Sequence, residues 1–505
     1  MAVACTYTIQ PHLLDGSEVS VEVDLSRGIH SYSIVGLAGK AVEEAKDRVN
    51  ASITHTGQKP PRNCGKRVTI SLSPADLKKE GPLFDVPIAI SYLIASKAIT
   101  VDKKKRAYVG ELALDGSLRP VKGILSIAKT AHRLGYEELI VPKDNAVEAA
   151  LVDNIDIYPA ENLKAILAHI DIKHPTKLSL KKQERTHIPT VWNTSNIKLE
   201  DIKGNTQAKR ALTIAAAGKH NIMLVGPPGT GKTMLARALQ NIIPPLNRQE
   251  ALDVTAIHSI AGQLKEGICS TPPFRSPHHT ASHTALVGGG TYPKPGEVTL
   301  AHHGVLFMDE FPEFERRSLD ALRQPLEDRE VSISRVQQTT TFPASFILIA
   351  ALNPYRGSED GTTDYIGAIR ENYGNKISGP ILDRIDLWVD VPHIDHETLQ
   401  SINTQARETE TARTIVYNAR KRMYSRFRNT HKTNSELSSR DIDKHIELHQ
   451  EVKDLLKNSA KKLNLSPRSY HRVIKVARTI ADLDGDETIT PKHVLESLQY
   501  RIKLL

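Results

Sequence analysis

The sequence predicts a multidomain chain with an α/β fold at its centre and helices at its end. Short apolar runs typical of buried strands lie at 222–225, 305–308 and 346–351, and helical spacing covers 206–217. Beyond about residue 395 the spacing is helical to the end of the chain. A chain of 505 residues also exceeds what one hydrophobic core organises, so several domains are expected.

Changes of pattern set the expected domain boundaries. The first part alternates strand-like runs such as Val68–Leu72 with helix-like runs such as Leu125–Leu134, which predicts an α+β domain. A polar, basic stretch with two prolines is typical of a linker, and Thr490-Pro491 is a start signal for a last helix. The expected parts are residues 1–170, a linker over 171–196, an α/β core over 197–395 and a helical lid over 396–505.

Composition favours a cytoplasmic protein and excludes several other classes. The longest nearly uninterrupted apolar stretch, 86–95, is about half the roughly 20 residues that a membrane span needs, so no membrane partner is expected. The first residues show no secretion signal, and three distant cysteines form neither a disulfide framework nor a metal-ligand set. A net charge of +9 weakly favours a polyanionic partner.

A glycine-rich stretch between the strand at 222–225 and the next helix has a phosphate-binding pattern. It fits G-x-x-x-x-G-K-T, in which backbone N–H groups and a helix N-terminus face the phosphates. In this pattern Lys232 reaches the β- and γ-phosphates and Thr233 holds Mg²⁺. The sequence therefore predicts binding of ATP and Mg²⁺ by Gly226, Pro227, Pro228, Gly229, Thr230, Gly231, Lys232 and Thr233.

Two later strands end in polar residues suited to the same site. The run 305–308 leads into Asp309, the expected Mg²⁺ ligand through water, and Glu310, the expected base that polarises the attacking water. The run 346–351 is followed by Asn353, placed like a sensor that orients this water. Because acidic pairs at strand ends and Asn-Pro turns are common, both assignments depend on the P-loop before them.

Several specific motifs around the acidic pair carry a resemblance to a known family. They are 273–280, 287–290, 295–297 and 300–310, with 208–212 before the P-loop and 318–327 after the acidic pair. With these motifs the chain resembles the magnesium-chelatase-like AAA+ proteins, in particular the ComM (YifB) branch, over almost its whole length. The resemblance implies an AAA+ P-loop NTPase core with a helical lid.

The same resemblance implies a function. It implies a ring-forming ATPase, expected as a homohexamer, that works as a DNA helicase and drives branch migration during natural transformation and recombination. Single-stranded and branched DNA are then the expected partners, with a recombinase as a further one.

Two arginines resemble parts of such a ring. Arg384 is similar to an arginine finger that reaches the nucleotide of a neighbouring subunit, and Arg468 is similar to a second sensor on the helical lid. A surface salt bridge is the alternative explanation for each of them.

The first 170 residues resemble the proteolytic domain of Lon proteases, in particular over 73–82 and 121–133. Lon proteases use a serine activated by a lysine. The positions that align with this pair hold Leu83 and Leu125, which supply neither a nucleophile nor a base. The resemblance therefore implies a catalytically inactive Lon-like domain, retained for assembly or DNA contact.

Clustered histidines and a missing cysteine set bear on zinc. His278, His279, His283, His302 and His303 lie close together in the sequence, and we favour a structural role for them over a zinc site. The family often carries four cysteines between the sensor Asn and the arginine finger, but no cysteine lies between Asn353 and Arg384 here. A zinc knuckle in that interval is excluded because its ligands are absent.

Two segments are candidates for DNA contact. Strand-like runs at 330–334 and 339–342 predict a hairpin, which relatives place in a central pore, so Arg335 and Gln337 at its tip are expected to contact the DNA backbone. An ordinary surface hairpin remains the alternative. The basic segment 420–428 carries aromatic residues, but a helix with a solvated cationic face explains it as well and is favoured.

Two other functions stay open. One is a chelatase-type AAA+ protein remodeller that acts with partner subunits, against which the Lon-like domain argues. The other is a scaffold that binds ATP only as an assembly switch, against which Lys232, Asp309 and Glu310 argue. Stimulation of ATP hydrolysis by forked or four-way DNA would separate these alternatives.

Overall fold

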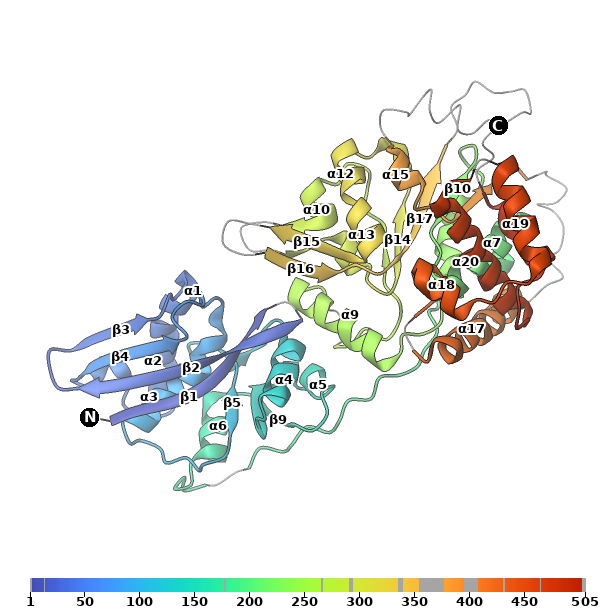
Figure 1. Ribbon diagram of the computed structural model, residues 1–505. Coiled ribbons are helices and arrows are strands. Elements are labelled where there is room, and N and C mark those ends of the chain that lie inside the picture. The colour runs from blue at the N-terminus through green and yellow to red at the C-terminus, as the bar shows by residue number, and fades with distance from the viewer. Residues whose placement is uncertain are drawn as a thin grey trace. The chain divides into compact units, whose positions relative to one another are not determined.

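The computed structural model describes residues 2–12, 14–176, 179–264, 267–289, 294–334, 339–353, 377–394, 407–429, 432–463 and 465–501 (Figure 1). The chain forms two compact units. The first comprises Met1–Pro189 together with Arg248–Cys269, and the second comprises Thr190–Asn247 and Ser270–Leu505.

The first unit is built on a seven-stranded mixed sheet in the order β3-β4-β2-β1-β5-β8-β9. Long strands β1 and β2 form an antiparallel hairpin, while β5, β8 and β9 extend the sheet in parallel. In β4 every second residue is buried, as the alternation at 68–72 predicts, and β8 is buried throughout because it is an inner strand. The strands are β1 (Ala2–His12), β2 (Asp15–Ser26), β3 (Ser31–Val35), β4 (Arg67–Ser73), β5 (Arg106–Tyr108), β8 (Glu138–Pro142) and β9 (Asp156–Ala160).

Helices complete this unit. The most apolar stretch of the chain forms α3 (Asp85–Ala95), which is buried on nearly all sides and packs against β1 and β2. Within the described residues, no helix is long and apolar enough to cross a membrane. Helix α4 (Ile124–Arg133) matches the predicted helical spacing to within a residue at each end. The other longer helices are α2 (Ala45–His55) and α6 (Leu163–Ile170).

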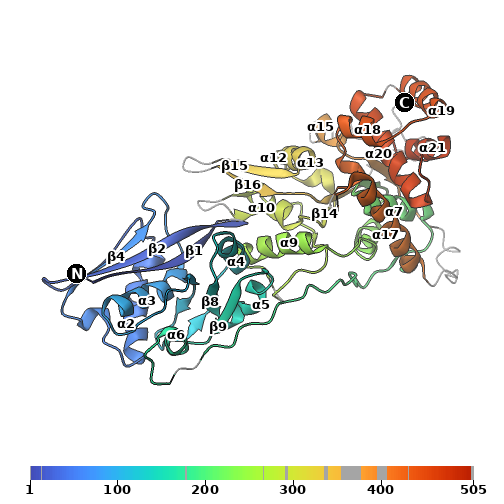
Figure 2. The same ribbon diagram turned by 60° about the horizontal axis from the view of Figure 1, so that its bottom comes forward.

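Helix α9 (Arg248–Ala261) belongs to the first unit although it follows the P-loop in the sequence. It lies beside α4 in Figures 1 and 2, where Leu252 and Ala256 join Leu125 in a small hydrophobic cluster. Lys129 and Asp253 form an ion pair of 3.2 Å across the two helices. A helix from inside the predicted α/β core range thus completes the core of the N-terminal part.

The second unit contains a five-stranded parallel sheet in the order β11-β14-β17-β10-β18. All residues of β10, β14 and β17 are buried, because helices cover both faces of such a sheet. The strands are β11 (Phe274–Arg275), β14 (Val305–Met308), β17 (Ile347–Leu352), β10 (Ile222–Val225) and β18 (Leu387–Asp390), and the helices flanking β10 in sequence are α7 (Thr206–Gly218) and α8 (Lys232–Leu239).

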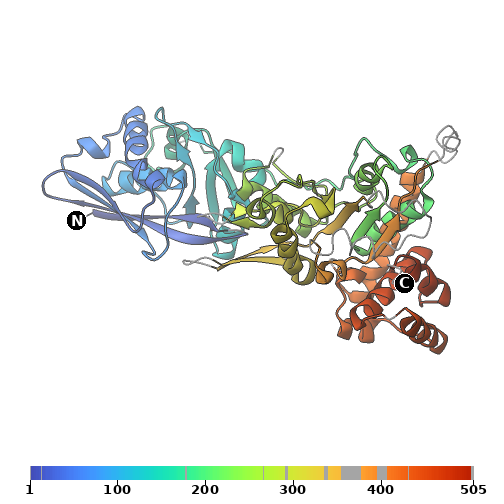
Figure 3. The same cartoon turned by 90° about the horizontal axis from the view of Figure 1, so that it is seen from above.

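The C-terminal helices gather into a bundle, the lid, seen as the red group in Figure 3. Helix α20 packs against both α17 and α7, which joins the lid to the sheet-bearing part of the unit. Thr490 caps the last helix and Pro491 occupies its first turn, as the sequence predicts. The lid helices are α17 (Glu408–Phe427), α18 (Ser439–His445), α19 (Gln450–Lys462), α20 (Pro467–Asp484) and α21 (Pro491–Gln499).

Candidate nucleotide site

The predicted nucleotide-binding residues follow three neighbouring strands of the parallel sheet. The P-loop follows β10, the acidic pair follows β14, and Asn353 follows β17. Because these strands are parallel and adjacent, their carboxyl ends share one edge of the sheet. The connection that follows β10 runs toward β11 at one edge of the sheet, whereas the connection that follows the adjacent β17 runs the other way, to β18. Such a switch point between neighbouring strands is where open α/β sheets bind ligands.

Backbone geometry explains the glycines of the P-loop. A Cβ on Gly226 would lie 2.2 Å from the carbonyl oxygen of Val391, so no larger residue fits beside β18. Gly229 has φ +80°, in the left-handed region that favours glycine. The loop then opens directly into α8, so its N–H groups lie at a helix N-terminus.

At the start of α8, Lys232 is buried and Thr233 is exposed, and both side chains form hydrogen bonds within the predicted site. The Nζ of Lys232 donates to the carbonyl oxygens of Gly226 and Pro227, both at 2.8 Å. Burial lowers the pKa of the Lys232 ammonium, and the Asp309 carboxylate opposes this effect. Thr233 Oγ1 donates to Asp309 Oδ2 at 2.9 Å, which brings the two predicted Mg²⁺ ligands together. A hydroxyl and a carboxylate oxygen beside a buried lysine suit a magnesium-bound phosphate.

Glu310 has a strained backbone, and its partner is a histidine whose contact with it the sequence did not show. Its φ is +50°, which is uncommon outside glycine and typical of functional sites. His279 Nδ1 lies 3.2 Å from Glu310 Oε2, so a histidine of the 273–280 motif holds the predicted base. His302 has a different role, since its Nδ1 accepts a hydrogen bond from the Ser345 amide at 3.0 Å. In the part of the chain that the structure describes, no group of three or more His, Cys, Asp or Glu side chains could hold a metal ion.

Arg384 and Arg468 share one carboxylate. The Nη2 of Arg384 donates to Glu327 Oε2, and the Nη2 of Arg468 donates to Glu327 Oε1 at 2.8 Å. Burial, with the nearby charges of Arg468 and Arg472, lowers the pKa of Arg384. These residues line a cavity of about 570 Å³ to which no residue of the P-loop or the acidic pair contributes. The sequence shows neither that these two arginines meet nor that Glu327 is their shared partner, because the three residues are far apart in the chain.

A chain of buried polar side chains borders this arginine cavity, beginning at Asp386 and Arg472, which also line it. Asp386, two residues after Arg384, pairs with His220 at 3.1 Å and lies 3.6 Å from Arg472. Burial opposes ionisation of Asp386, but the hydrogen bond from His220 and the charge of Arg472 hold its pKa well below the ordinary value. His220 also hydrogen-bonds Thr479 at 2.8 Å, so the chain runs from the sheet into helix α20.

The candidate DNA contacts have different outcomes. The predicted hairpin is present, with β15 (Glu330–Ser334) paired antiparallel to β16 (Thr339–Pro343), but Arg335 and Gln337 lie outside the described residues. In the basic segment, Arg420 is buried and donates to backbone carbonyl oxygens of α7. Arg426 pairs with Asp482. Arg420 and Arg426 therefore have structural partners and do not belong to the solvated cationic face that the sequence analysis favoured.

The two positions that align with the Lon serine and lysine are apolar and buried. Leu83 joins the main core of the first unit. Leu125 packs with Leu151, Leu252 and Ala256 of helix α9 and its surroundings. Its amide donates to Glu148 at 3.2 Å.

Comparison with known protein families gives matches over most of the chain. Residues 198–399 match the family profile for magnesium chelatase, subunit ChlI, and residues 406–501 match the profile for its C-terminal part. Residues 21–145 match a further profile described as subunit ChlI of Mg-chelatase.

Full-length relatives are equally informative. The chain is 41% identical to competence protein ComM of Haemophilus influenzae, over 99% of this chain and 98% of that protein. It is 40% identical to the uncharacterized protein YifB of Salmonella typhimurium, over 99% and 97%. A Lon protease of Brevibacillus choshinensis is 25% identical over 32% of this chain and 22% of its own length. With its three profile matches and its full-length identity, the chain belongs to the ComM (YifB) family of magnesium-chelatase-like AAA+ ATPases.

Proposed function

We propose that the protein is an ATP-dependent DNA motor that assembles into a ring, expected to be a hexamer, and drives branch migration during natural transformation. The observation that carries the proposed ATPase activity is that Lys232, Thr233 and Asp309 lie together at the carboxyl edge of the parallel sheet. The competence name of a relative that is 41% identical over 98% of its length supports the pathway. Single-stranded and branched DNA are the proposed substrates, with a recombinase as a partner.

Each site residue has a proposed task. Lys232 holds the β- and γ-phosphates, while Thr233 and Asp309 would hold Mg²⁺, which when bound offsets phosphate charge. Glu310, positioned by His279, takes the proton of the attacking water, and Asn353 orients that water. This division of tasks requires the water to lie near the carboxyl ends of β14 and β17.

The arginine cavity favours assembly. Arg384 and Arg468 lie together at Glu327 in a cavity that no P-loop residue lines, so we propose that both act on the nucleotide of a neighbouring subunit. A ring supplies such a neighbour at every interface. For the first unit we propose an inactive Lon-like domain, because Leu83 and Leu125 are apolar and buried.

The test compares ATP hydrolysis by the full chain alone, with duplex DNA, with dT-only single strands, and with a four-way junction. The proposal expects the junction to stimulate turnover most, and junction resolution into exchanged duplexes to require hydrolysis. A second candidate is a chelatase-type protein remodeller, favoured by the profile matches to subunit ChlI over 21–145, 198–399 and 406–501. If no form of DNA changes the rate of ATP hydrolysis, the DNA-motor proposal is wrong and the remodeller is favoured.

A further inference from the structure

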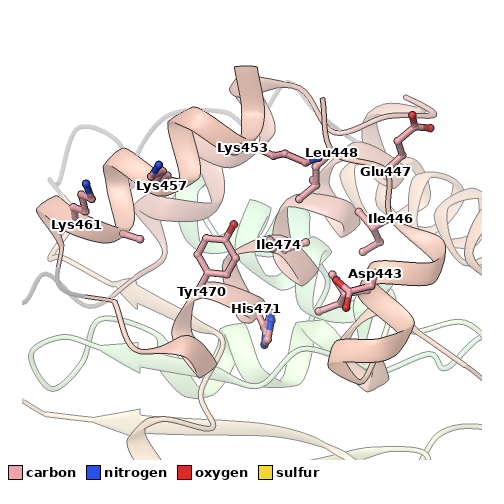
Figure 4. Close-up of a pocket in the computed structure, with 12 residues that line it drawn as sticks. Asp443, Ile446, Glu447, Leu448, Lys453, Lys457, Lys461, Tyr470, His471 and Ile474 are labelled. Atoms are coloured by element: carbon pink, nitrogen blue, oxygen red, sulfur yellow. The ribbon is translucent and has the colours of Figure 1, made fainter. Parts of the chain in front are cut away.

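A groove in the lid lies between helices α18, α19 and α20 (Figure 4). Its volume is about 940 Å³. Ile442, Ile446 and Ile474 form the apolar floor as part of the lid core, with Leu448 and the Tyr470 ring half-buried beside them. The three isoleucines are already covered by the lid core, so the apolar surface open to a partner comes from the half-buried Leu448 and Tyr470.

One rim of the groove is basic. Lys453, Lys457 and Lys461 follow one another at four-residue intervals along α19, so they lie on one face, about 6 Å apart along the helix axis. Figure 4 shows the three side chains along the same helix. All three are exposed, and none forms an ion pair with any described residue.

The opposite rim is acidic. Asp443 lies on α18, Glu447 lies two residues beyond the end of that helix, and both line the groove. Both are exposed and, like the lysines, neither forms an ion pair with a described residue. The groove therefore presents opposite charges along its two edges without neutralising either edge from within the lid.

This charge distribution discriminates between occupants. A nucleic-acid strand would gain from the lysines, but its phosphates would be repelled by the carboxylates at the other rim. An amphipathic helix satisfies the floor with an apolar stripe and both rims with two charged edges. Because its residues also recur along one face every four positions, acidic side chains at that interval match the lysines of α19 one to one.

We propose that this groove binds an amphipathic α-helix of a partner protein. The helix carries acidic residues at four-residue intervals along the edge that faces α19 and basic residues along the edge that faces Asp443 and Glu447. The interaction follows from the lid surface alone and is independent of what the ATPase drives.

The position of the groove gives this interaction a consequence. His471 lines both the groove and the arginine cavity, and it follows Arg468 by three residues on α20. A helix seated in the groove therefore contacts the first turns of α20, from which Arg468 reaches Glu327. Resting on the ATPase proposed above, this predicts that the bound helix changes turnover without touching the P-loop.

The test uses designed, hydrocarbon-stapled 18-residue helices with a leucine stripe and a fluorescein label. The first carries glutamates on one edge and lysines on the other, and the second carries lysines on both edges. A fluorescent dT15 strand is the third probe, and fluorescence anisotropy with the full-length protein measures each affinity. We expect the first peptide to bind at least tenfold tighter than the second.

Two variants of equal charge change make the result specific. Lys453→Glu/Lys457→Glu/Lys461→Glu is expected to weaken the first peptide at least tenfold and to strengthen the second. The matched variant Lys421→Glu/Lys444→Glu/Lys462→Glu changes exposed lysines that do not line the groove and should leave both affinities unchanged. The proposal is wrong if neither peptide binds, if the two variants behave alike, or if only dT15 responds to the groove variant. If the unmodified protein binds the first peptide but its ATP hydrolysis is not stimulated by the four-way junction, the result counts against the DNA motor alone.

Discussion

At the scale of single residues, the proposed nucleotide site assigns binding and hydrolysis to different side chains. Lys232 is buried and held by carbonyl oxygens of the P-loop, whereas Glu310 is exposed and contacts His279 at the end of the next strand. In the proposed mechanism the first residue belongs to the phosphate cradle and the second lies beside the attacking water. Substitutions at these two positions should therefore fail in different ways.

Lys232→Ala is expected to lose nucleotide binding, because it removes the buried cation of the cradle. Glu310→Gln is expected to bind ATP normally but to lower turnover by about 10² or more, the range of general-base contributions. Measuring affinity with a fluorescent ATP analogue and turnover by phosphate release separates the two. Near-normal turnover by Glu310→Gln would show that another group is the base.

Gly226 provides a second residue-scale prediction. In Gly226→Ala the new methyl would meet the Val391 carbonyl at 2.2 Å, so β18 or the P-loop must shift. Overpacking of this kind costs about 1–3 kcal/mol, and the displaced loop should bind ATP poorly. Gly379→Ala is the control, because nothing lies within 4 Å of its added Cβ. Thermal unfolding and ATP affinity of both variants check this, and equal behaviour would contradict it.

At the scale of elements, the limits of sequence analysis follow from the range of the interactions. The strands β10, β14 and β17, helix α4 and the cap of α21 were predictable because periodicity and capping are local. The pairing of Arg384 and Arg468 through Glu327 was not predictable, because the residues next to an arginine or a glutamate do not show which distant side chain it will meet. Helix α9 shows the same limit, since amphipathic spacing does not state which core receives the apolar face.

Helix α9 also buries a carboxyl group whose ionisation should affect stability. Glu148 is buried beside α4 and α9, and burial raises its pKa to about 7, although hydrogen bonds from Ser259 and the Leu125 amide oppose this. The folded state therefore binds the proton more tightly than the unfolded state, where a glutamate has a pKa near 4.5. Stability is fully present below that value and falls as the pH rises through about 7.

Glu148→Gln mimics the protonated carboxyl and should remove this loss. We expect little change at pH 5 and a gain of up to about 3 kcal/mol at pH 8, from the difference between the two pKa values. Hydrogen exchange of the α4 and α9 amides at both pH values measures it in the first unit. The exposed Glu137→Gln is the control. A gain that is the same at pH 5 and pH 8 would show that ionisation of Glu148 is not its source.

At the scale of the whole molecule, the shared carboxylate of Glu327 bears on how subunits would assemble around a nucleotide. Because the two arginines bind one carboxylate, we propose that they act on the same nucleotide. If that nucleotide belongs to a neighbouring subunit, each working site takes its P-loop from one chain and both arginines from the next. This arrangement can be tested by mixing inactive subunits.

Three mixtures give a distinct pattern. Arg384→Ala mixed with Lys232→Ala should recover ATP hydrolysis, because some interfaces join an intact P-loop to intact arginines. Arg468→Ala mixed with Lys232→Ala should recover it for the same reason. Arg384→Ala mixed with Arg468→Ala should not recover, because every donor of arginines then lacks one of the two. Arginine fingers contribute roughly 10³–10⁵ in rate in GTPases, so even sparse intact interfaces should be visible.

The third mixture decides the geometry. If Arg468 instead acted on the nucleotide of its own subunit, an interface with the P-loop of an Arg384→Ala chain and the finger of an Arg468→Ala chain would be complete, and activity would return. Native mass spectrometry of subunits with different tags establishes that the rings have mixed before turnover is measured. Recovery in the third mixture would therefore separate the two arginines, whereas its absence beside recovery in the first two would place both at the same interface.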